Sequence, residues 1–382
     1  MSFFTTGMSK KIYYVANMRL PTEKAHGVQI MKMCEAFARQ GAIVELVVPN
    51  RRTHITGDPF VYYGVEENFS ITRLSVIDSV SFGRLGFLLE TLSFAVSAFF
   101  HIRGTYADAI FGRDETILFP LSFLSVRKII WETHTGAWNY VARKMSKRAS
   151  AIITISQGLK DFYLKHGVAK EKLFVAHDGV DLADYEISLS QKEARAHLGL
   201  PDGKRIALYV GRLDGWKGVD TLYASAHFLP EDIMHVVIGG DDKDLGMLRE
   251  MHPKVRFLGY RPYTELARNL RAADVLVLPN NGKNEISVSF TSPLKLFAYM
   301  ASGLPIVASD LPSLREILDE ETATLVEADS PLALAEGIQR VFSVPQRAEI
   351  HGKNAKQKVQ AYSWEKRAQA ILVQAFPEEL DV

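Results

Sequence analysis

An arginine and a lysine in a glycine-rich segment are the first candidates for chemistry. The segment GRLDGWKG, Gly211 to Gly218, follows the apolar run RIALYV, so it reads as a loop between a strand and a helix. In such a loop Arg212 and Lys217 can bring a guanidinium and an ammonium group to one diphosphate, and glycines allow the backbone to approach it. We therefore expect Gly211, Arg212 and Lys217 to bind phosphate.

A second anion site is expected where SPLKLFAYMASG opens a helix. Ser292 can cap this helix, and Pro293 suits its first position, where no amide donor is needed. The free N–H groups around Ser292, Pro293 and Leu294, together with the helix dipole, favour a phosphate. Lys295 either adds a charge or covers the helix surface with its stem. The helix is expected to hold the same diphosphate as Arg212 and Lys217.

Two further loops follow apolar strand-like runs. Gly239 and Gly240 come after HVVI, and Gly259 and Tyr260 come after VRFL. Gly239 and Gly240 mark either a tight turn or a close approach of backbone to a ligand. Backbone groups at Gly259 and Tyr260 can recognise the edge of a base.

Strand-like runs alternate with amphipathic helical runs along the whole chain, which is typical of βαβ units and parallel sheets. We predict an α/β protein with two doubly wound, Rossmann-like domains that face each other across a cleft. The expected ranges are 1–182 for the first domain, 183–204 for a linker, 205–360 for the second domain, and 361–382 for a helix that returns to the first domain. Ligands should lie beyond the carboxyl ends of the strands.

The composition is that of an ordinary globular protein. The chain has 382 residues, of which 47% are hydrophobic and 23% are charged. Cys34 is the only cysteine, and no Cys/His cluster has zinc spacing, so neither an internal disulfide nor a metal site is expected. The N-terminal stretch lacks the features of a secretory signal, and we expect a cytoplasmic protein. No cofactor and no nucleic-acid partner are expected.

Charge and hydropathy also raise the question of a membrane. Residues 1–182 hold 22 Lys and Arg against 16 Asp and Glu, a net charge of +6, which suits an anionic partner. The most apolar window, Leu85 to Ile102, is interrupted by Glu90. It reads either as a buried core helix or as a helix at a membrane surface. Peripheral attachment to an anionic inner membrane face is the functional hypothesis, and solvated charge without a partner is the alternative.

In this order the motifs resemble family 4 (group 1) of the retaining glycosyltransferases, whose two-domain architecture is called GT-B. The resemblance is specific over residues 205–320 and looser before them, where HG at 26–27, ETHTG at 132–136 and AHDGVDL at 176–182 match. YSWEKRA at 362–368 is similar to the family's crossover region. The resemblance implies that residues 1–182 form an acceptor-binding domain and residues 205–360 a nucleotide-sugar-binding domain. It also implies that Arg212 and Lys217 bind the donor diphosphate, that Gly27 lies in a loop near donor and acceptor, and that His134 lies near the transferred sugar. A purely structural His134 is the alternative.

The sequence departs from the family at one place on the expected donor-site helix. The family usually has two glutamates with seven residues between them, and the second holds the nucleotide ribose. The matched positions here are Phe290 and Ala298, and Glu285 is out of register. The resemblance implies transfer of a hexose from a GDP- or UDP-sugar to a glycan or lipid-linked acceptor, in bacterial polysaccharide or glycolipid synthesis, without a metal. A nucleotide-sugar-binding subunit that has lost catalysis is the alternative that Ala298 raises. An epimerase or phosphorylase is a weaker interpretation, and a dehydrogenase is weaker still because no G-x-G-x-x-G follows the first strand.

Overall fold

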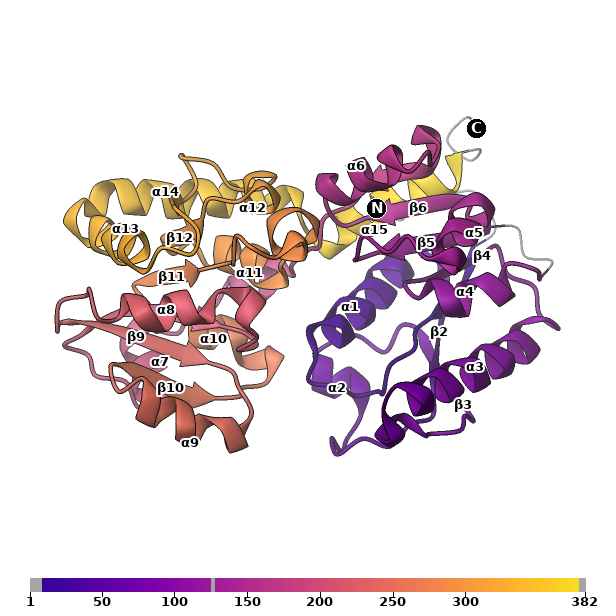
Figure 1. Ribbon diagram of the computed structural model, residues 1–382, viewed down its shortest axis with the longest axis horizontal. Coiled ribbons are helices and arrows are strands. Elements are labelled where there is room, and N and C mark those ends of the chain that lie inside the picture. Colours follow the sequence, from indigo (N-terminus) through magenta and orange to yellow (C-terminus); the bar gives the residue numbers. More distant parts are fainter. Residues whose placement is uncertain (1–8, 125–127, 378–382) are drawn as a thin grey trace. The chain divides into compact units, whose positions relative to one another are not determined.

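The computed structural model describes residues 9–124 and 128–377 (Figure 1). Backbone contacts divide the chain into two compact units. Unit 1 comprises Met1–His177 and Trp364–Val382, and unit 2 comprises Asp178–Ser363. Each unit is described by itself.

Unit 1 is built on a seven-stranded parallel sheet in the order β3-β2-β1-β4-β5-β6-β7. Its strands are β1 (Lys11–Val15), β2 (Ile43–Pro49), β3 (Ser70–Leu74), β4 (Ala109–Gly112), β5 (Lys128–Thr133), β6 (Ala151–Thr154) and β7 (Leu173–Val175). Its helices are α1 (Ala25–Arg39), α2 (Pro59–Tyr63), α3 (Gly83–Ile102), α4 (Glu115–Leu121), α5 (Tyr140–Arg148), α6 (Gln157–Lys165) and α15 (Trp364–Ala375). The central strands β1, β4 and β6 are buried almost throughout, as expected for a sheet covered on both faces.

Helices form two layers over this sheet. Helix α3 contacts α4, which contacts α5, and α1 contacts α2 and α15. The strand order reverses between β1 and β4, so the loops after these strands diverge there and leave room for a ligand at the carboxyl edge.

Unit 2 repeats the plan with a six-stranded parallel sheet in the order β10-β9-β8-β11-β12-β13. Its strands are β8 (Arg205–Val210), β9 (Ile233–Ile238), β10 (Val255–Gly259), β11 (Val275–Leu278), β12 (Ile306–Ser309) and β13 (Thr324–Val326). Its helices are α7 (Gln191–Leu198), α8 (Val219–Ser225), α9 (Asp242–Met251), α10 (Leu266–Leu270), α11 (Leu294–Ser302), α12 (Pro312–Arg315), α13 (Pro331–Ser343) and α14 (Pro345–Lys358). The order reverses between β8 and β11, so ligands of this unit are expected after these two strands.

The predicted fold class is confirmed, since both sheets are parallel and alternate with helices. The final helix contacts α1 of unit 1, and its Trp364, Ile371 and Leu372 are buried. Residues 183–204, expected as a linker, carry α7 and lie within unit 2, where Ala194 and Leu198 join the core.

The sequence pattern missed one strand. β3, with the sequence SITRL, is an edge strand of which no residue is fully buried. It lacks the apolar run that marks the central strands, because only one of its sides pairs with a neighbour.

Candidate functional site

Glycines bring the loops after β8, β9 and β11 together in unit 2. Gly211 and Gly239 both have positive φ angles, 146° and 135°. A Cβ atom on Gly239 would overlap the carbonyl oxygen of Gly211, and one on Gly218 would overlap that of Pro279. The backbone of the loop that carries Arg212 and Lys217 is therefore packed directly on its neighbours. The glycines fix the shape of this loop.

Arg212 and Lys217 lie in the loop after β8, as predicted. The Arg212 side chain is 62% exposed and its Nη2 lies 3.0 Å from Oδ1 of Asp214. Such an exposed ion pair contributes little to the stability of the fold, so the guanidinium can leave Asp214 and bind a ligand instead. Lys217 ends the 3-10 turn Gly215–Lys217, and its Nζ lies 3.5 Å from the centre of the Trp216 ring. Burial lowers the pKa of Lys217 to about 8, while Asp214 acts to raise it.

Lys295 supplies a third cation to the same region. Its buried Nζ lies 3.8 Å from the centre of the Tyr209 ring and has no hydrogen-bond partner among the residues that the structure describes. Burial, followed by the charge of Lys217, lowers the pKa of Lys295 well below its ordinary value. Because a buried, unpaired ammonium group is costly, the region around Gly211 favours an anion.

The helix after this region begins one residue later than predicted. α11 starts at Leu294 with Pro293 at its N-cap position, and no side chain of the described residues caps it. Ser292 is not the cap, because its Oγ accepts a hydrogen bond from the Asp178 amide at 2.9 Å. The first-turn N–H groups of α11 are thus left without a side-chain acceptor, and they strengthen the case for an anion.

Asn280 is a residue of this site that the sequence analysis missed. It follows β11, its side chain is completely buried, and neither its amide oxygen nor its amide nitrogen has a partner within 9–124 and 128–377. Buried polar atoms are nearly always hydrogen-bonded, so a pair of unpaired ones beside a glycine-packed loop points to a ligand or ordered water. The only sequence signal was Asn280–Asn281 directly after the run VLVLP.

Ala298 lies on α11 one turn after Lys295. It is 2% exposed and belongs to the hydrophobic core of unit 2, while Leu294, Lys295 and Ser302 on the same helix are only half-buried. Spacings of three and four residues place Ala298 on the face that these three share. A glutamate at 298 would therefore extend along the Lys295 face of the helix.

Of the remaining loop residues expected at the donor site, the three glycines pack against protein atoms and the tyrosine is exposed. Gly240 packs tightly, because a Cβ atom there would come within 2.6 Å of Leu213. Gly259 has a φ of 77°, and its carbonyl accepts a hydrogen bond from the Gly239 amide at 2.8 Å. Tyr260 is 47% exposed. Gly239 and Gly240 therefore meet protein atoms, which agrees with the tight-turn interpretation.

A buried polar network surrounds His134 in unit 1. His134 follows β5, and its Nε2 lies 2.6 Å from Oε1 of Glu132. The same oxygen accepts from Nε2 of Gln29 at 2.8 Å, and Arg113 donates to Gln29 at 3.1 Å. These contacts join the ends of β4 and β5 to the first turns of α1, at the point where the strand order reverses.

Helix α15 adds Arg367 to this network. Nη2 of Arg367 donates to Oε2 of Glu132 at 2.7 Å, and the two side chains are only 3% and 0% exposed. Burial alone would raise the pKa of Glu132, but Arg367, His134 and Arg113 together hold it well below its ordinary value. Burial and the charge of Arg113 lower the pKa of His134 to about 4, against the opposing effect of Glu132. His134 is therefore neutral near pH 7, with its Nε2 proton directed at Glu132.

Gly27 is not in a loop, as the resemblance implied, but in the first turn of α1. A Cβ atom there would overlap the Tyr63 hydroxyl and approach Thr22 to 2.8 Å. The Tyr63 hydroxyl in turn accepts from the Thr22 amide at 2.7 Å and donates to its carbonyl at 2.8 Å. Gly27 thus permits close packing of α1 on the loop after β1.

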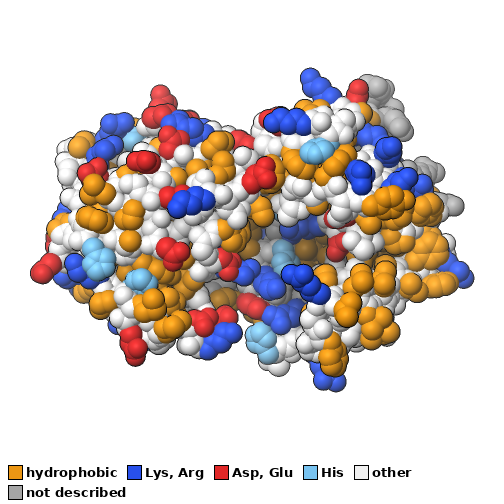
Figure 2. Space-filling view, in the orientation of Figure 1, with side chains coloured by type: hydrophobic (Ala, Val, Ile, Leu, Met, Phe, Trp, Pro, Cys, Tyr) orange, Lys and Arg blue, Asp and Glu red, His pale blue; other side chains and the backbone are white. Residues whose placement is uncertain are grey.

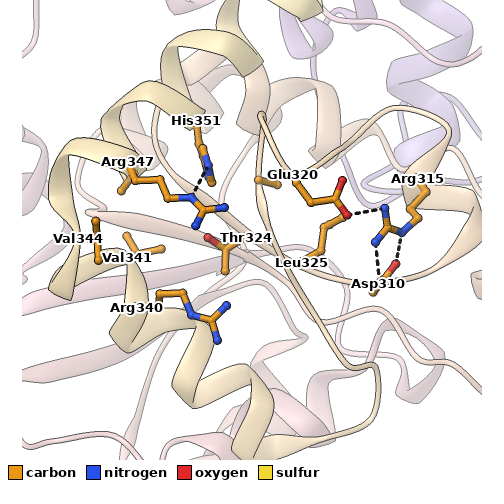
Figure 3. A pocket seen from close by; sticks show the side chains of 12 residues that line it. Asp310, Arg315, Glu320, Thr324, Leu325, Arg340, Val341, Val344, Arg347 and His351 are labelled. Carbon is orange, nitrogen blue, oxygen red and sulfur yellow. Dashed lines mark hydrogen bonds and ion pairs between the residues drawn. The ribbon is translucent and has the colours of Figure 1, made fainter.

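A separate pocket of about 220 Å³ lies in unit 2 between β13, α13 and α14 (Figure 3). Its charged groups are largely paired: Arg315 binds Asp310 and Glu320, and Arg347 binds His351. It contains none of the residues expected at the donor site. Within the described ranges no group of three His, Cys, Asp or Glu side chains could hold a metal ion.

Comparison with known domains identifies the family of the chain. The domain described as Glycosyltransferase Family 4 matches residues 26–184, and the domain described as Glycosyl transferases group 1 matches residues 204–343. This chain belongs to the group 1 and family 4 glycosyltransferases. An uncharacterized glycosyltransferase of Methanocaldococcus jannaschii is 30% identical over 229 residues, which are 56% of each chain. The match thus spans about half the length of that curated relative.

Solved glycosyltransferase structures share the fold over nearly the whole chain. Sucrose-phosphate synthase from Thermosynechococcus elongatus has a TM-score of 0.76 at 22% identity, and the match covers 97% of this chain and 99% of that one. HepE from Anabaena in complex with UDP-glucose has a TM-score of 0.74 at 16% identity, with 97% and 99% covered. These similarities establish the fold of this glycosyltransferase family member.

Proposed function

We propose that this protein transfers a hexosyl group from a nucleotide diphosphate sugar to an acceptor hydroxyl, with retention of the anomeric configuration. The single observation that carries the proposal is the meeting of Lys217, the unpaired Nζ of Lys295 and the uncapped first turn of α11 around Gly211. Two lysines and a helix N-terminus, with Asp214 as the nearby acid, suit a diphosphate that can displace that acid and keep both lysines protonated. That HepE binds UDP-glucose in a similar fold supports a UDP-sugar as the first donor to test.

The chemistry required of these residues is stabilisation of the leaving group. Negative charge builds on the β-phosphate as the bond to the sugar breaks. Lys217, Lys295 and the α11 amides would stabilise it through preorganised electrostatics, and Arg212 would join them after leaving Asp214. A residue that stabilises the leaving diphosphate by its charge transfers no proton itself, so Arg212, Lys217 and Lys295 would act as cations and not as acids or bases.

Unit 1 would supply the acceptor side of the reaction. His134 is neutral and held by Glu132, so its Nδ1 can accept a hydrogen bond from a sugar or acceptor hydroxyl. Asn280 in unit 2 has one donor group and one acceptor atom to offer the donor sugar or nucleotide. A glycan or lipid-linked acceptor used in bacterial surface glycan synthesis remains the proposed acceptor class.

The test is donor binding and transfer by paired variants. Wild-type protein should show a raised melting temperature with one or more nucleotide sugars, because a ligand that binds only the folded state stabilises it. Arg212→Ala and Lys217→Ala should abolish detectable transfer with little change in unliganded stability. Lys353→Ala is the matched control, since this lysine is 71% exposed and forms an exposed ion pair with the nearby Glu349.

Two outcomes would contradict the assignment. Near-normal turnover by either variant would mean that Arg212 or Lys217 does not act on the diphosphate. Donor binding without transfer by the wild-type chain, across a panel of acceptors, would favour the alternative of a binding subunit. That alternative rests on Ala298, where the family's ribose-binding glutamate would stand.

A further inference from the structure

Helix α3 turns an apolar face away from unit 1. Side chains on the face toward the fold recur about every four residues and include small and polar ones, namely Gly86, Glu90, Phe94, Ala98 and Ile102, which are buried. The outward side chains are 46–81% exposed: Phe82, Leu85, Phe87, Leu88, Leu89, Leu92, Val96 and Phe100. Figure 2 shows hydrophobic side chains gathered over this part of unit 1. A surface helix normally turns its apolar face toward the core and its polar face toward solvent.

Polar contacts hold α3 to the fold on its inner side. Nδ2 of Asn17, in the loop after β1, donates to Glu90 at 3.2 Å and to Oγ1 of Thr91 at 3.1 Å. Oγ of Ser97 donates to the Ser75 carbonyl at 2.8 Å. By length and composition the segment Val80–Ile102, with a mean hydropathy of 1.6, could also cross a membrane. Only 39% of its most apolar window is buried inside the protein, so most of that window is left uncovered. These contacts explain why the helix lies along unit 1 while its outer face stays uncovered.

Basic side chains lie at both ends of α3 and on the nearby helix α5. Arg84 lies in the first turn of α3, and Arg103 directly follows the helix with its guanidinium 4.6 Å from the centre of the Phe100 ring. Helix α4 links α3 to α5, where Arg143, Lys144, Lys147 and Arg148 are exposed. Every fully exposed charged side chain of α3, α4 and α5 is Lys or Arg. The acids of these helices are Glu90, which is buried, and Glu115, which is half-buried.

Exposed aromatic side chains lie next to two of these cations. The Arg148 guanidinium is 3.9 Å from the centre of the Phe123 ring, and Lys144 Nζ is 5.4 Å from that of Tyr140. Phe123 and Tyr140 are 60% and 63% exposed. An exposed apolar helix face, with exposed aromatic rings and basic groups on neighbouring elements, has the composition expected of a surface that contacts hydrocarbon and anionic headgroups.

We propose that α3 docks on the surface of an anionic lipid bilayer, with its axis in the membrane plane and the α5 cations at the headgroups. The exposed charges of α3, α4 and α5 are all positive, and they favour anionic lipid over a second copy of this chain, because a copy would bring further cations to the same surface. The proposal goes beyond sugar transfer. It stands or fails separately, since none of its residues belongs to the donor site.

Vesicle sedimentation tests the proposal directly. The wild-type protein should sediment with vesicles of phosphatidylcholine and phosphatidylglycerol, and not with phosphatidylcholine alone. Binding should weaken as salt rises, since surface attraction is screened over about 10 Å at 0.1 M. The triple variant Leu85→Ser/Leu92→Ser/Val96→Ser should lose at least tenfold in binding, and so should Arg143→Gln/Lys144→Gln/Lys147→Gln. Val61→Ser is the matched control, because Val61 is 78% exposed on α2 and distant in sequence from α3.

A second measurement keeps the test valid if a triple variant misfolds. Leu92→Trp should show a blue-shifted emission with the anionic vesicles, and lipids brominated near the headgroups should quench it more than lipids brominated at the chain ends. Four results would overturn the proposal: equal binding to neutral vesicles, no binding to either kind, unchanged binding by the apolar variant, or stronger quenching at the bilayer centre. A wild-type dimer in solution that the apolar variant converts to monomer would overturn it in favour of a second copy.

Discussion

Replacing Glu132 by glutamine should destabilise the protein far more than loss of an ordinary ion pair. Three donors meet on this carboxylate: Gln29 and His134 on one oxygen, and Arg367 on the other. A glutamine keeps the shape but offers only one oxygen. At least one donor must then face the new NH₂ group, and the buried charge of Arg367 loses its counter-charge.

The burial of this pair sets the size of the effect. Glu132 is 0% and Arg367 3% exposed, so water cannot replace the lost partner. Removing one member of a buried pair typically lowers the free energy of unfolding by about 3–5 kcal/mol. Exposed pairs contribute roughly 0–1 kcal/mol. The double variant Glu132→Gln/Arg367→Gln should lose less than the sum of the two single variants, because each single change leaves the other group buried and unpaired.

Urea unfolding followed by tryptophan fluorescence measures this difference. Trp131, Trp138 and Trp364 lie in unit 1 and Trp216 in unit 2, so the signal reports mainly on the unit that contains Glu132. Arg19→Gln is the control, because Arg19 pairs with Glu23 at 2.6 Å with both side chains about 30% exposed. If Glu132→Gln lost no more stability than Arg19→Gln, or if the single effects simply added, the network would not be the coupled unit described here.

Three further predictions concern protonation and the donor site. The pKa of His134 is about 4 in the folded protein, below its value of about 6.5 in an unfolded chain. Between these values the unfolded state binds the extra proton, so the free energy of unfolding should fall as the pH drops from about 6.5 to 4. In acid-unfolding curves His134→Asn should flatten this fall, and an unchanged slope would contradict the assignment. Lys217 has a pKa of about 8 without ligand, so its ammonium group is lost as the pH rises above 8. UDP affinity measured by calorimetry should therefore decline above pH 8, and binding should take up a proton. A pH-independent affinity without proton uptake would exclude this lysine from the phosphate site. Ala298→Glu should bind nucleotide sugar at least several-fold more tightly and raise transfer, since a hydrogen bond to a charged group contributes about 1.5–3 kcal/mol. Because Ala298 is 2% exposed, the glutamate must reach Lys295 or the ribose, and unchanged affinity would show that the ribose is held in another way.

The sequence predicted the fold well because its strands are long apolar runs separated by glycine and proline signals. RIALYV, for example, occupies the whole of β8, Arg205–Val210. The half-exposed edge strand β3 escaped this criterion, since its pattern depends on which neighbour covers it. Boundaries of helices were less certain, as α11 shows: Ser292 looked like a cap but bonds to Asp178, which lies 114 residues away.

Parts of the candidate site could be predicted for the same reason. Arg212, Lys217 and the glycines belong to one local loop, so their grouping is visible in the sequence. Glu132, Gln29, Arg113 and Arg367 come from four separate elements, and only tertiary packing brings them together. Asn280 was missed because an asparagine after a strand is common, and its unpaired amide is evident only from burial.

The position of Arg367 has a consequence for how the chain is made. Residue 132 leaves the ribosome long before residue 367, and the whole of unit 2 is synthesised between them. During that interval the Glu132 carboxylate has no Arg367 beside it, and the groove that α15 fills along α1 exposes apolar surface. Unit 2 is continuous in sequence and can fold as soon as it emerges. Unit 1, although it is begun first, therefore becomes complete only after unit 2 has been synthesised, and the emergence of α15 is the step that covers its apolar groove and pairs Glu132.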